Sequence, residues 1–316
     1  MDKAKDIFLE TINPEKTQIK GKLPFIWVFG SGGDDIKRIE QIRDPLYPFH
    51  PEHIPYHRIN SFRAKFIQWS KTSGHVISDR LVVPESYPNW LNFDKYSNLI
   101  DFELDISSIS QGIIIFSESI GAYTEIGMFS CFTELHKNIL ILAQEKHINK
   151  SNTSFFNYGA IFKINENKIS EELDNVWALD NSLDSKDKEY WDTLFCNISD
   201  HFLDIITDKG NGKMKFNIDN RHHIILLLLD LIDLFPNQTK TFYRKILIAF
   251  KINIDNGFLT KIINTLDILE LLDTRKSGKN TYFSLKIKDY VSCLDYQADS
   301  PKKFERSAFK ISMRNS

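Results

Sequence analysis

The sequence predicts an α/β protein, in which a Rossmann-like parallel sheet is followed by a mostly helical domain of the winged helix-turn-helix type. In the first half, short continuous apolar runs alternate with segments of helical periodicity, which is typical of parallel strands covered by helices. In the last third, three helical segments precede two strands that are joined by a basic, glycine-containing turn. We therefore expect domains at 1–165 and 221–316, joined by a helical connector at 166–220.

The composition is that of a folded protein without a membrane span. Of the 316 residues, 42% are hydrophobic and 13% are aromatic, which is enough to build sizeable cores. The three cysteines are scattered, which argues against a disulfide framework or a zinc site. The first ten residues have no signal-peptide core, and the most apolar segment, 224–235, is too short to cross a bilayer. We expect a cytoplasmic protein with no membrane contact.

The predicted sheet domain consists of strands and helices that alternate along the chain. The run at 23–30 is apolar and ends in glycines, and the run at 112–116 is apolar throughout, so both are typical of buried strands. Large apolar side chains recur at helical spacing in 58–72. The elements are, in order, strand 23–30, helix 58–72, strand region 75–86, helix 97–107, strand 112–116, helix 124–137 and strand 138–144.

Three polar loops follow the predicted strands. They are the glycine-rich GSGGDD at 30–35, PES at 84–86 and SESIGAYTE at 117–125. In parallel sheets of this kind, ligands bind at the carboxyl ends of the strands. The three loops therefore predict one ligand site at that edge of the sheet, where the unpaired N–H groups of the glycine loop are suited to an anion or a ribose.

The acidic loop at 117–125 suggests chemistry at a glycosidic bond. We expect Gly121 to permit a tight turn and Thr124 to cap a helix whose first turn contains Glu125, which would favour the ionised carboxylate. An ionised carboxylate in a cleft can attack or stabilise an anomeric carbon. The candidates for a second, acidic group are Glu118, Asp34, Asp35 and Glu85. The alternative is that Glu125 serves only to stabilise the helix start.

The segment 44–57 contains four prolines and three histidines. His53 and His57 are four residues apart, but the histidines lie along a proline-rich loop, where this spacing does not place them on one face of a helix as a helical metal motif requires. We therefore expect a lid or a surface insertion here, and no bound metal.

The second half is polar up to about residue 220, with one predicted helix at 188–206 and a turn at 208–213. Three helices are then expected in 221–272, closed by a hairpin at 271–286. From Pro236 to the end there are 15 Lys and Arg against 8 Asp and Glu, a charge of +7, whereas the remainder has 25 against 34, a charge of −9. The basic excess favours a nucleic-acid partner, although winged helices also bind proteins. The expected phosphate contacts are Lys261, Arg275, Lys276 and Lys279.

Four motifs together resemble a known family. They are VFGSGGDD, VPES, IIIFSESIGAYTEIGMFS and SFFNYG, and they lie within residues 23–165. This set is similar to the nucleoside deoxyribosyltransferase-like effectors of type II retrons. In those anti-phage systems, the effector is held by a reverse transcriptase and its multicopy single-stranded DNA (msDNA). The winged helix also matches the second domain of such effectors.

The resemblance implies roles for individual residues. Glu125, in the Glu-Ile-Gly element, is the expected nucleophile, and Glu118 stands near the place of the family's upstream aspartate. Asn157 and Tyr158 are expected to complete the site of a neighbouring subunit, so a homodimer or a higher assembly is implied. The 44–57 segment departs from the family as an insertion. The full expected substrate-binding set is Gly32, Gly33, Asp34, Glu85, Ser119, Tyr123 and Asn157.

Two functions remain open at this point. The first is an N-glycosidase that cleaves the ribose–base bond of NAD or a related nucleotide, needs no cofactor beyond that substrate, and is restrained by the reverse transcriptase and msDNA. The second is a transcriptional regulator that senses a nucleotide without cleaving it and binds DNA through its winged helix.

Overall fold

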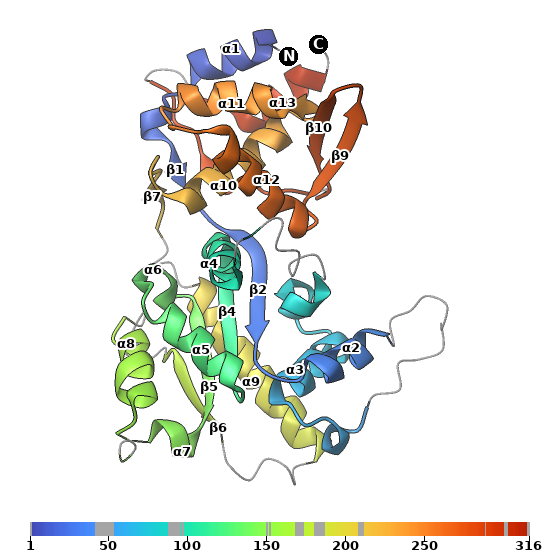
Figure 1. Ribbon diagram of the computed structural model, residues 1–316, viewed down its shortest axis with the longest axis vertical. Helices are drawn as coiled ribbons and strands as arrows, with labels where there is room; N and C mark the ends of the chain where they lie inside the picture. The colour runs from blue at the N-terminus through green and yellow to red at the C-terminus, as the bar shows by residue number, and fades with distance from the viewer. Residues whose placement is uncertain are drawn as a thin grey trace. The chain divides into compact units, whose positions relative to one another are not determined.

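The computed structural model describes residues 2–41, 54–87, 96, 98–149, 151, 153–167, 174–179, 187–207, 212–287, 289–299 and 303–314. The chain forms two compact units, each assembled from separate stretches (Figure 1). Unit 1 comprises 1–23, 89–109 and 211–316, and unit 2 comprises 24–88 and 110–210. Most of the proline-rich segment expected to be a lid lies outside the described residues.

Unit 2 contains a five-stranded sheet in the order β3-β2-β4-β5-β6. The pairs β2–β3, β4–β5 and β5–β6 are parallel, with Ile113 opposite Ile139 and Ile141 opposite Val176. The predicted parallel sheet is therefore confirmed. The strands are β2 (Leu23–Phe29), β3 (Leu81–Val82), β4 (Ser110–Ser117), β5 (Ile139–Gln144) and β6 (Val176–Leu179).

Helices cover both faces of this sheet. The described α-helices of unit 2 are α2 (Gly33–Gln41), α3 (Phe62–Ser73), α5 (Ile120–Phe129), α6 (Thr133–His136), α7 (Glu145–Ile148), α8 (Phe162–Asn165) and α9 (Lys188–Thr207). Alternate strand residues such as Ile114 and Phe116 share a core with α3 and α9, whereas Phe29 on the opposite face packs against Phe129 of α5. At Gly112, a Cβ would lie 2.4 Å from the ring of Phe202, so glycine lets α9 approach β4 closely.

Helix α3 is more deeply enclosed than its amphipathic pattern predicts. Every residue from Phe62 to Ser70 is buried, including the polar Arg63, Lys65 and Gln68. These polar groups have partners: the Lys65 ammonium lies 4.5 Å from the centre of the Trp191 ring, and Gln68 exchanges hydrogen bonds with the backbone of Ile54. The helix is enclosed because α2 and α9 both pack against it.

The expected strand region at 75–86 is mostly turn. It contains η3 (Ser78–Arg80), the two-residue strand β3 and η4 (Pro84–Ser86), which are short helical turns. Another such turn, η2 (Tyr56–Arg58), precedes α3, and a π-helical segment, η6 (Phe156–Ile161), leads into α8. The PES motif therefore forms a turn that follows a strand, as expected, but the strand is very short.

Unit 1 is mostly helical and carries two small antiparallel sheets. One sheet has the order β8-β10-β9 and the other β11-β1-β7. The helices are α1 (Asp2–Thr11), α4 (Leu99–Ile109), α10 (Arg221–Leu234), α11 (Lys240–Ala249), α12 (Asn256–Ile268) and α13 (Arg306–Arg314), with η1 (Pro14–Lys16) after α1. The strands are β1 (Gln18–Ile19), β7 (Met214–Lys215), β8 (Gln238–Thr239), β9 (Leu272–Ser277), β10 (Asn280–Leu285) and β11 (Leu294–Asp295).

The division between the units differs from the expected boundaries at 165 and 220. Residues 1–23 and helix α4 were placed in the sheet domain, but both belong to unit 1. Helix α4 packs on α10 and α12, and its Asp105 pairs with Arg221 and accepts a 2.7 Å hydrogen bond from the Tyr96 hydroxyl. The units cannot be single continuous segments, because the chain leaves unit 2 to form α4 in unit 1 and returns to unit 2 at β4. Within the described ranges, no helix is both long enough and apolar enough to span a bilayer.

Candidate functional site

Helix α5 begins earlier than the sequence suggests. Ser119 is its N-cap, and the Ser119 Oγ accepts a 3.1 Å hydrogen bond from the Ala122 N–H. Thr124, the expected cap, instead donates from its hydroxyl to the Ile120 carbonyl at 2.9 Å. Both are good capping residues, so sequence alone could not separate the two starts. Glu125 consequently lies in the second turn, away from the free N–H groups of the helix start.

The Glu125 carboxyl group is half-buried, and its Oε2 atom is fully buried without a hydrogen-bond partner among the described residues. Burial raises the pKa of Glu125 to about 7, the Arg63 guanidinium opposes the rise, and the nearby Glu85 carboxylate adds to it. The expectation that a helix terminus would favour the ionised form is therefore wrong. A carboxyl group whose pKa is shifted towards neutral by burial and by named charged neighbours is typical of a functional site.

Arg63 joins two of the three loops. Its side chain is 3% exposed, its Nη1 donates to the Gly30 carbonyl at 2.8 Å, and its Nη2 pairs with Glu85. Arg63 also acts electrostatically on Glu125, as does Glu85. The glycine loop, the PES turn and the acidic loop therefore meet around one guanidinium group. Sequence reasoning missed Arg63 because an arginine in an amphipathic helix is usually solvated.

Glu118 has a structural role at the start of α3. Its carboxylate accepts hydrogen bonds from the Ser61 hydroxyl at 2.7 Å, the Phe62 N–H at 2.8 Å and the Arg63 N–H at 3.1 Å. It therefore stabilises a helix N-terminus that carries Arg63. With its oxygens engaged in this way, Glu118 orients the site and is a poor candidate for the acid that protonates a leaving group.

The glycine loop lies close to Ser61 and Glu85, at two positions where there is little or no room for a side chain. Gly32 has φ +88°, and a Cβ there would lie 2.4 Å from the Ser61 Cβ. A Cβ on Gly33 would lie 3.2 Å from Glu85 Oε1. Asp34, by contrast, is solvent-exposed and lies 3.9 Å from the Lys37 ammonium. The structure thus brings Gly32, Gly33 and Glu85 together, and leaves the Asp34 side chain at the surface.

Tyr123 and Asn157 make structural contacts beside the site. The Tyr123 ring packs edge-on against Phe156 at 4.9 Å and against His147 at 6.1 Å. Asn157 is buried, and its Nδ2 donates to the Asn149 carbonyl at 3.0 Å. Tyr158, expected with Asn157 to serve a neighbouring subunit, has 57% of its surface exposed. These contacts fix η6 against α5 and α7.

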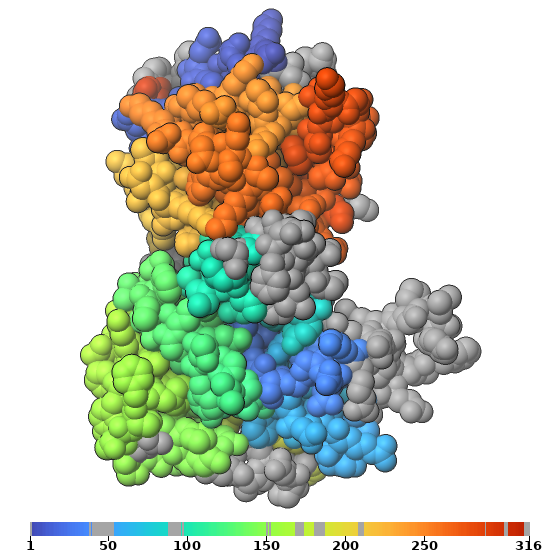
Figure 2. All heavy atoms as spheres, viewed as in Figure 1, coloured from blue at the N-terminus to red at the C-terminus, as the bar shows by residue number. Residues whose placement is uncertain are grey.

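The basic residues expected to bind nucleic acid fall into two groups. Arg275, Lys276 and Lys279 lie on the exposed β9–β10 hairpin, whose tip turns at Gly278 with φ +58° (Figure 2). Lys261 is directed elsewhere: its ammonium lies 3.5 Å from Asp101 of α4 and 5.4 Å from the centre of the Tyr96 ring. Three of the four residues expected to contact phosphates therefore lie on an exposed hairpin, and their contact with nucleic acid stays a prediction.

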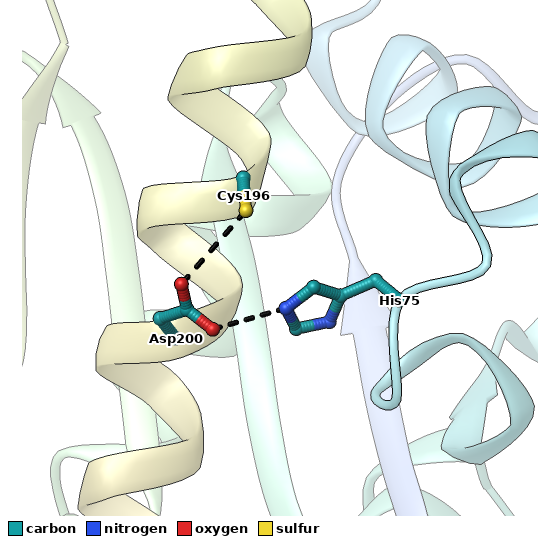
Figure 3. Close-up of side chains that lie close together, drawn as sticks. All are labelled: His75, Cys196 and Asp200. Atoms are coloured by element: carbon teal, nitrogen blue, oxygen red, sulfur yellow. Dashed lines mark hydrogen bonds and ion pairs between the residues drawn. The ribbon is translucent and has the colours of Figure 1, made fainter.

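A cluster of His75, Cys196 and Asp200 carries atoms able to bind a metal, within 4.8 Å of one another (Figure 3). The backbone N–H of Ile77 donates to His75 Nδ1 at 3.3 Å, so the ring proton lies on Nε2. Nε2 then donates to Asp200 Oδ1 at 3.0 Å, and Cys196 Sγ lies 3.8 Å from Asp200 Oδ2. Because a metal would need Nε2 unprotonated, this arrangement is that of a hydrogen-bonded cluster that ties the loop after α3 to α9.

The fold and the site define an α/β protein with a half-buried carboxyl group of raised pKa near the ends of its parallel strands, in a chain that also has a helical unit with a basic hairpin. The chain belongs to the STM3845 retron effector protein family, whose model matches residues 59–274. It is also similar to the "Retron Ec73 putative ribosyltransferase/DNA-binding protein" of Escherichia coli, with 26% identity over 218 residues. That alignment covers 64% of this chain and 65% of the relative.

Proposed function

We propose that this protein is the N-glycosidase effector of a retron anti-phage defence system, and that it cleaves the ribose–base bond of NAD or a related nucleotide. The observation that carries the proposal is Glu125, a carboxyl group with a pKa of about 7 and a buried, unpaired oxygen where three strand-end loops meet. Membership of a retron effector family and similarity to a protein named as a ribosyltransferase support it.

In the proposed reaction, ionised Glu125 attacks the anomeric carbon as the ribose–base bond breaks. The bonding electrons leave with the base nitrogen, and a bond forms between the Glu125 carboxylate and C1′. Water then attacks C1′, the bond between C1′ and the Glu125 carboxylate breaks, and one water proton passes to solvent. The products are the base-free nucleotide, which is ADP-ribose when NAD is the substrate, and the regenerated carboxylate. The glycine loop of this nucleoside deoxyribosyltransferase-like, Rossmann-like domain holds the sugar or phosphate through backbone N–H groups.

The leaving group of NAD suits this site. Nicotinamide leaves as a neutral base from a cationic pyridinium and needs no proton from the enzyme. Glu118 is engaged at the start of α3, and Glu85 is paired with Arg63. Of the other two expected acids, Asp34 has an exposed side chain, and Asp35 accepts a 3.3 Å hydrogen bond from the Asn60 N–H. None of the four is therefore poised to supply a proton. A purine or pyrimidine leaving group, in contrast, is assisted by protonation. This chemistry favours NAD among the candidate substrates.

We propose that α10, α11 and α12, with the β8-β10-β9 sheet, form a winged helix that binds the retron's nucleic acid. Its strand order and the exposed basic hairpin support this assignment. In the proposed assembly, the reverse transcriptase and msDNA restrain the glycosidase until infection. We also propose that the effector works as a homodimer or a higher assembly.

Base release from purified protein tests the enzymatic proposal. Wild-type protein should liberate nicotinamide from NAD, and Glu125→Gln should reduce the rate on the order of 10³-fold or more, as expected for loss of a nucleophile. Glu134→Gln, an exposed residue of α6, is the matched control and should retain full activity. Equal nucleotide consumption by Glu125→Gln and wild type would overturn the proposal.

The regulator hypothesis makes the opposite prediction in the same assay. A nucleotide sensor would bind the ligand and return it intact, whether or not Glu125 is present. Mass spectrometry of the bound and released nucleotide after incubation therefore separates the two functions.

A further inference from the structure

Two unpaired polar atoms of opposite hydrogen-bonding type are buried in the candidate site. Arg63 Nε is a donor, and Glu125 Oε2 is an acceptor, and neither has a partner among the described residues. Arg63 is 3% exposed. Buried polar groups are almost always paired, because an unpaired one costs about 1–3 kcal/mol. The two atoms therefore indicate a ligand that supplies both an acceptor and a donor.

The remaining atoms of Arg63 narrow the choice of ligand. Nη1 donates to the Gly30 carbonyl and Nη2 to Glu85, so Nε is the guanidinium nitrogen that has no partner among the described residues. An anionic group at this point would also face the unpaired oxygen of Glu125, which it would repel when ionised. A neutral hydroxyl group fits better, because it accepts one hydrogen bond and donates another.

We propose that Arg63 Nε and Glu125 Oε2 together bind the 2′-hydroxyl of the substrate's ribose, so that the enzyme selects ribonucleotides over 2′-deoxyribonucleotides. This inference rests on the proposed glycosidase function. If Glu125 Oε1 bonds to C1′, Oε2 lies beside C2′, the next ring carbon, and accepts a hydrogen bond from its hydroxyl. Arg63 Nε donates to the oxygen of the same hydroxyl.

The arrangement also aids the chemical step. Hydrogen bonds to the 2-hydroxyl strengthen as positive charge develops at the anomeric carbon, so they contribute most in the transition state. Without the 2′-hydroxyl, both buried atoms stay unpaired throughout the reaction. A site built to bind a hydroxyl group can reject the analogue that lacks it by as much as about 10⁴-fold. We expect kcat/KM for a ribonucleotide to be at least about a hundredfold higher than for its 2′-deoxy analogue, even though the glycosidic bonds of deoxyribosides are intrinsically more labile.

The experiment compares base release from nicotinamide mononucleotide and its 2′-deoxy analogue, and from AMP and dAMP, with the full-length protein. At least a hundredfold preference for the ribo member of whichever pair is cleaved supports the inference. Equal cleavage of the two members overturns the inference and leaves the glycosidase proposal intact. Absence of base release from both pairs and from NAD overturns the glycosidase proposal and, with it, this inference.

Arg63→Lys tests the assignment of the donor. Lysine keeps the positive charge and can pair with Glu85, but it lacks Nε–H, so the ribo-to-deoxy ratio of kcat/KM should fall at least tenfold. Arg58→Lys, an exposed position just before α3, is the control and should leave the ratio unchanged. An unchanged ratio in folded Arg63→Lys overturns the role of Arg63. If this variant does not fold, the wild-type ratio still decides the inference.

Discussion

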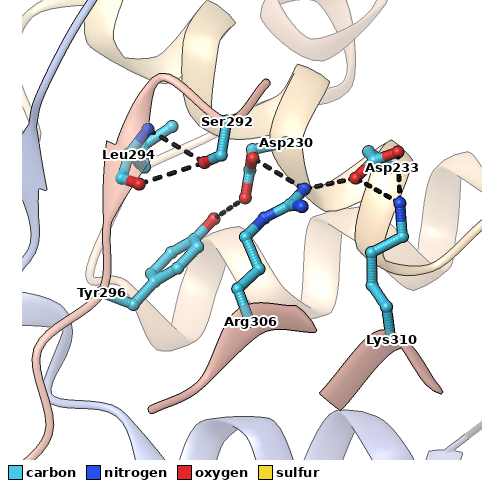
Figure 4. A network of polar contacts seen from close by, with 7 residues as sticks. All are labelled: Asp230, Asp233, Ser292, Leu294, Tyr296, Arg306 and Lys310. Atoms are coloured by element: carbon cyan, nitrogen blue, oxygen red, sulfur yellow. Dashed lines mark hydrogen bonds and ion pairs between the residues drawn. The ribbon is translucent and has the colours of Figure 1, made fainter. Parts of the chain in front are cut away.

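Each unit of the protein buries carboxyl groups, but the two units treat them differently. In unit 1, Asp230 is fully buried, accepts a 2.7 Å hydrogen bond from the Tyr296 hydroxyl and pairs with Arg306 Nη2 at 3.0 Å (Figure 4). Its neighbour Asp233 pairs with Arg306 and, at 2.8 Å, with Lys310. In unit 2, Glu125 keeps a buried oxygen without a partner among the described residues.

The difference is the one expected between a structural network of charges and a carboxyl group that is kept for a function. The Asp230 network connects α10 to α13 and to the segment that carries Tyr296, so its charges are used to join elements far apart in the chain. The Oε2 atom of Glu125 makes no such connection within the part of the chain that the structure describes. A buried carboxyl group that is held at a cost in stability, beside a fixed guanidinium, is the pattern expected of a site whose partner is the substrate.

The largest difference between the two kinds of carboxyl group is expected in the free energy of unfolding. Asp230→Asn should lower the free energy of unfolding by about 3–5 kcal/mol, because it leaves Arg306 buried without its full counter-charge. Glu125→Gln should not destabilise the protein, since it removes a carboxylate whose burial is unfavourable. Chemical denaturation at pH 8 measures both. A large loss of stability in Glu125→Gln would mean that Glu125 is structural after all.

The pH dependence of activity follows from the raised pKa of Glu125. Only the ionised carboxylate can attack C1′, so kcat/KM should rise about tenfold per pH unit below about 7 and level off above it. Stability should move in the opposite direction. Because the folded pKa lies above the ordinary 4.5, the stability that protonated Glu125 contributes is present below pH 4.5 and is lost as the pH rises through about 7. The stability of Glu125→Gln relative to wild type should rise across that window, and a flat difference would contradict the raised pKa.

The smallest effect is expected in the binding of nucleic acid by the β9–β10 hairpin of unit 1. Replacing Arg275, Lys276 and Lys279 with glutamine should weaken binding to single-stranded DNA most at low salt. The slope of log K against log salt should become shallower by roughly 0.7 for each lost phosphate contact. Lys261→Gln is the contrasting variant: its ammonium is directed to Asp101, so the slope should not change. A titration at several salt concentrations measures both slopes, and an equal change in the two would place the nucleic acid along α12.

Much of the sheet unit could be predicted because its signals are local. The apolar runs at 23–30, 112–116 and 138–144 correspond closely to β2, β4 and β5, and helix 188–206 to α9. Strand order along the chain also implied that the glycine loop, the PES turn and the acidic loop converge, and Arg63 does connect them. The cap of α5 could not be predicted, because Ser119 and Thr124 give equivalent local signals.

Local sequence patterns were enough to predict the strands, most of the helices and the loops from which the site is built, since periodicity and turn chemistry act over a few residues. The roles of the charged side chains in the site, in contrast, became clear from the folded chain alone. The tertiary structure assigned Glu118 to the start of α3, placed Arg63 between Gly30 and Glu85, and raised the pKa of Glu125 by burial. It also gave α4 to unit 1. These outcomes depend on solvent exclusion and on partners distant in the chain, which no local pattern encodes.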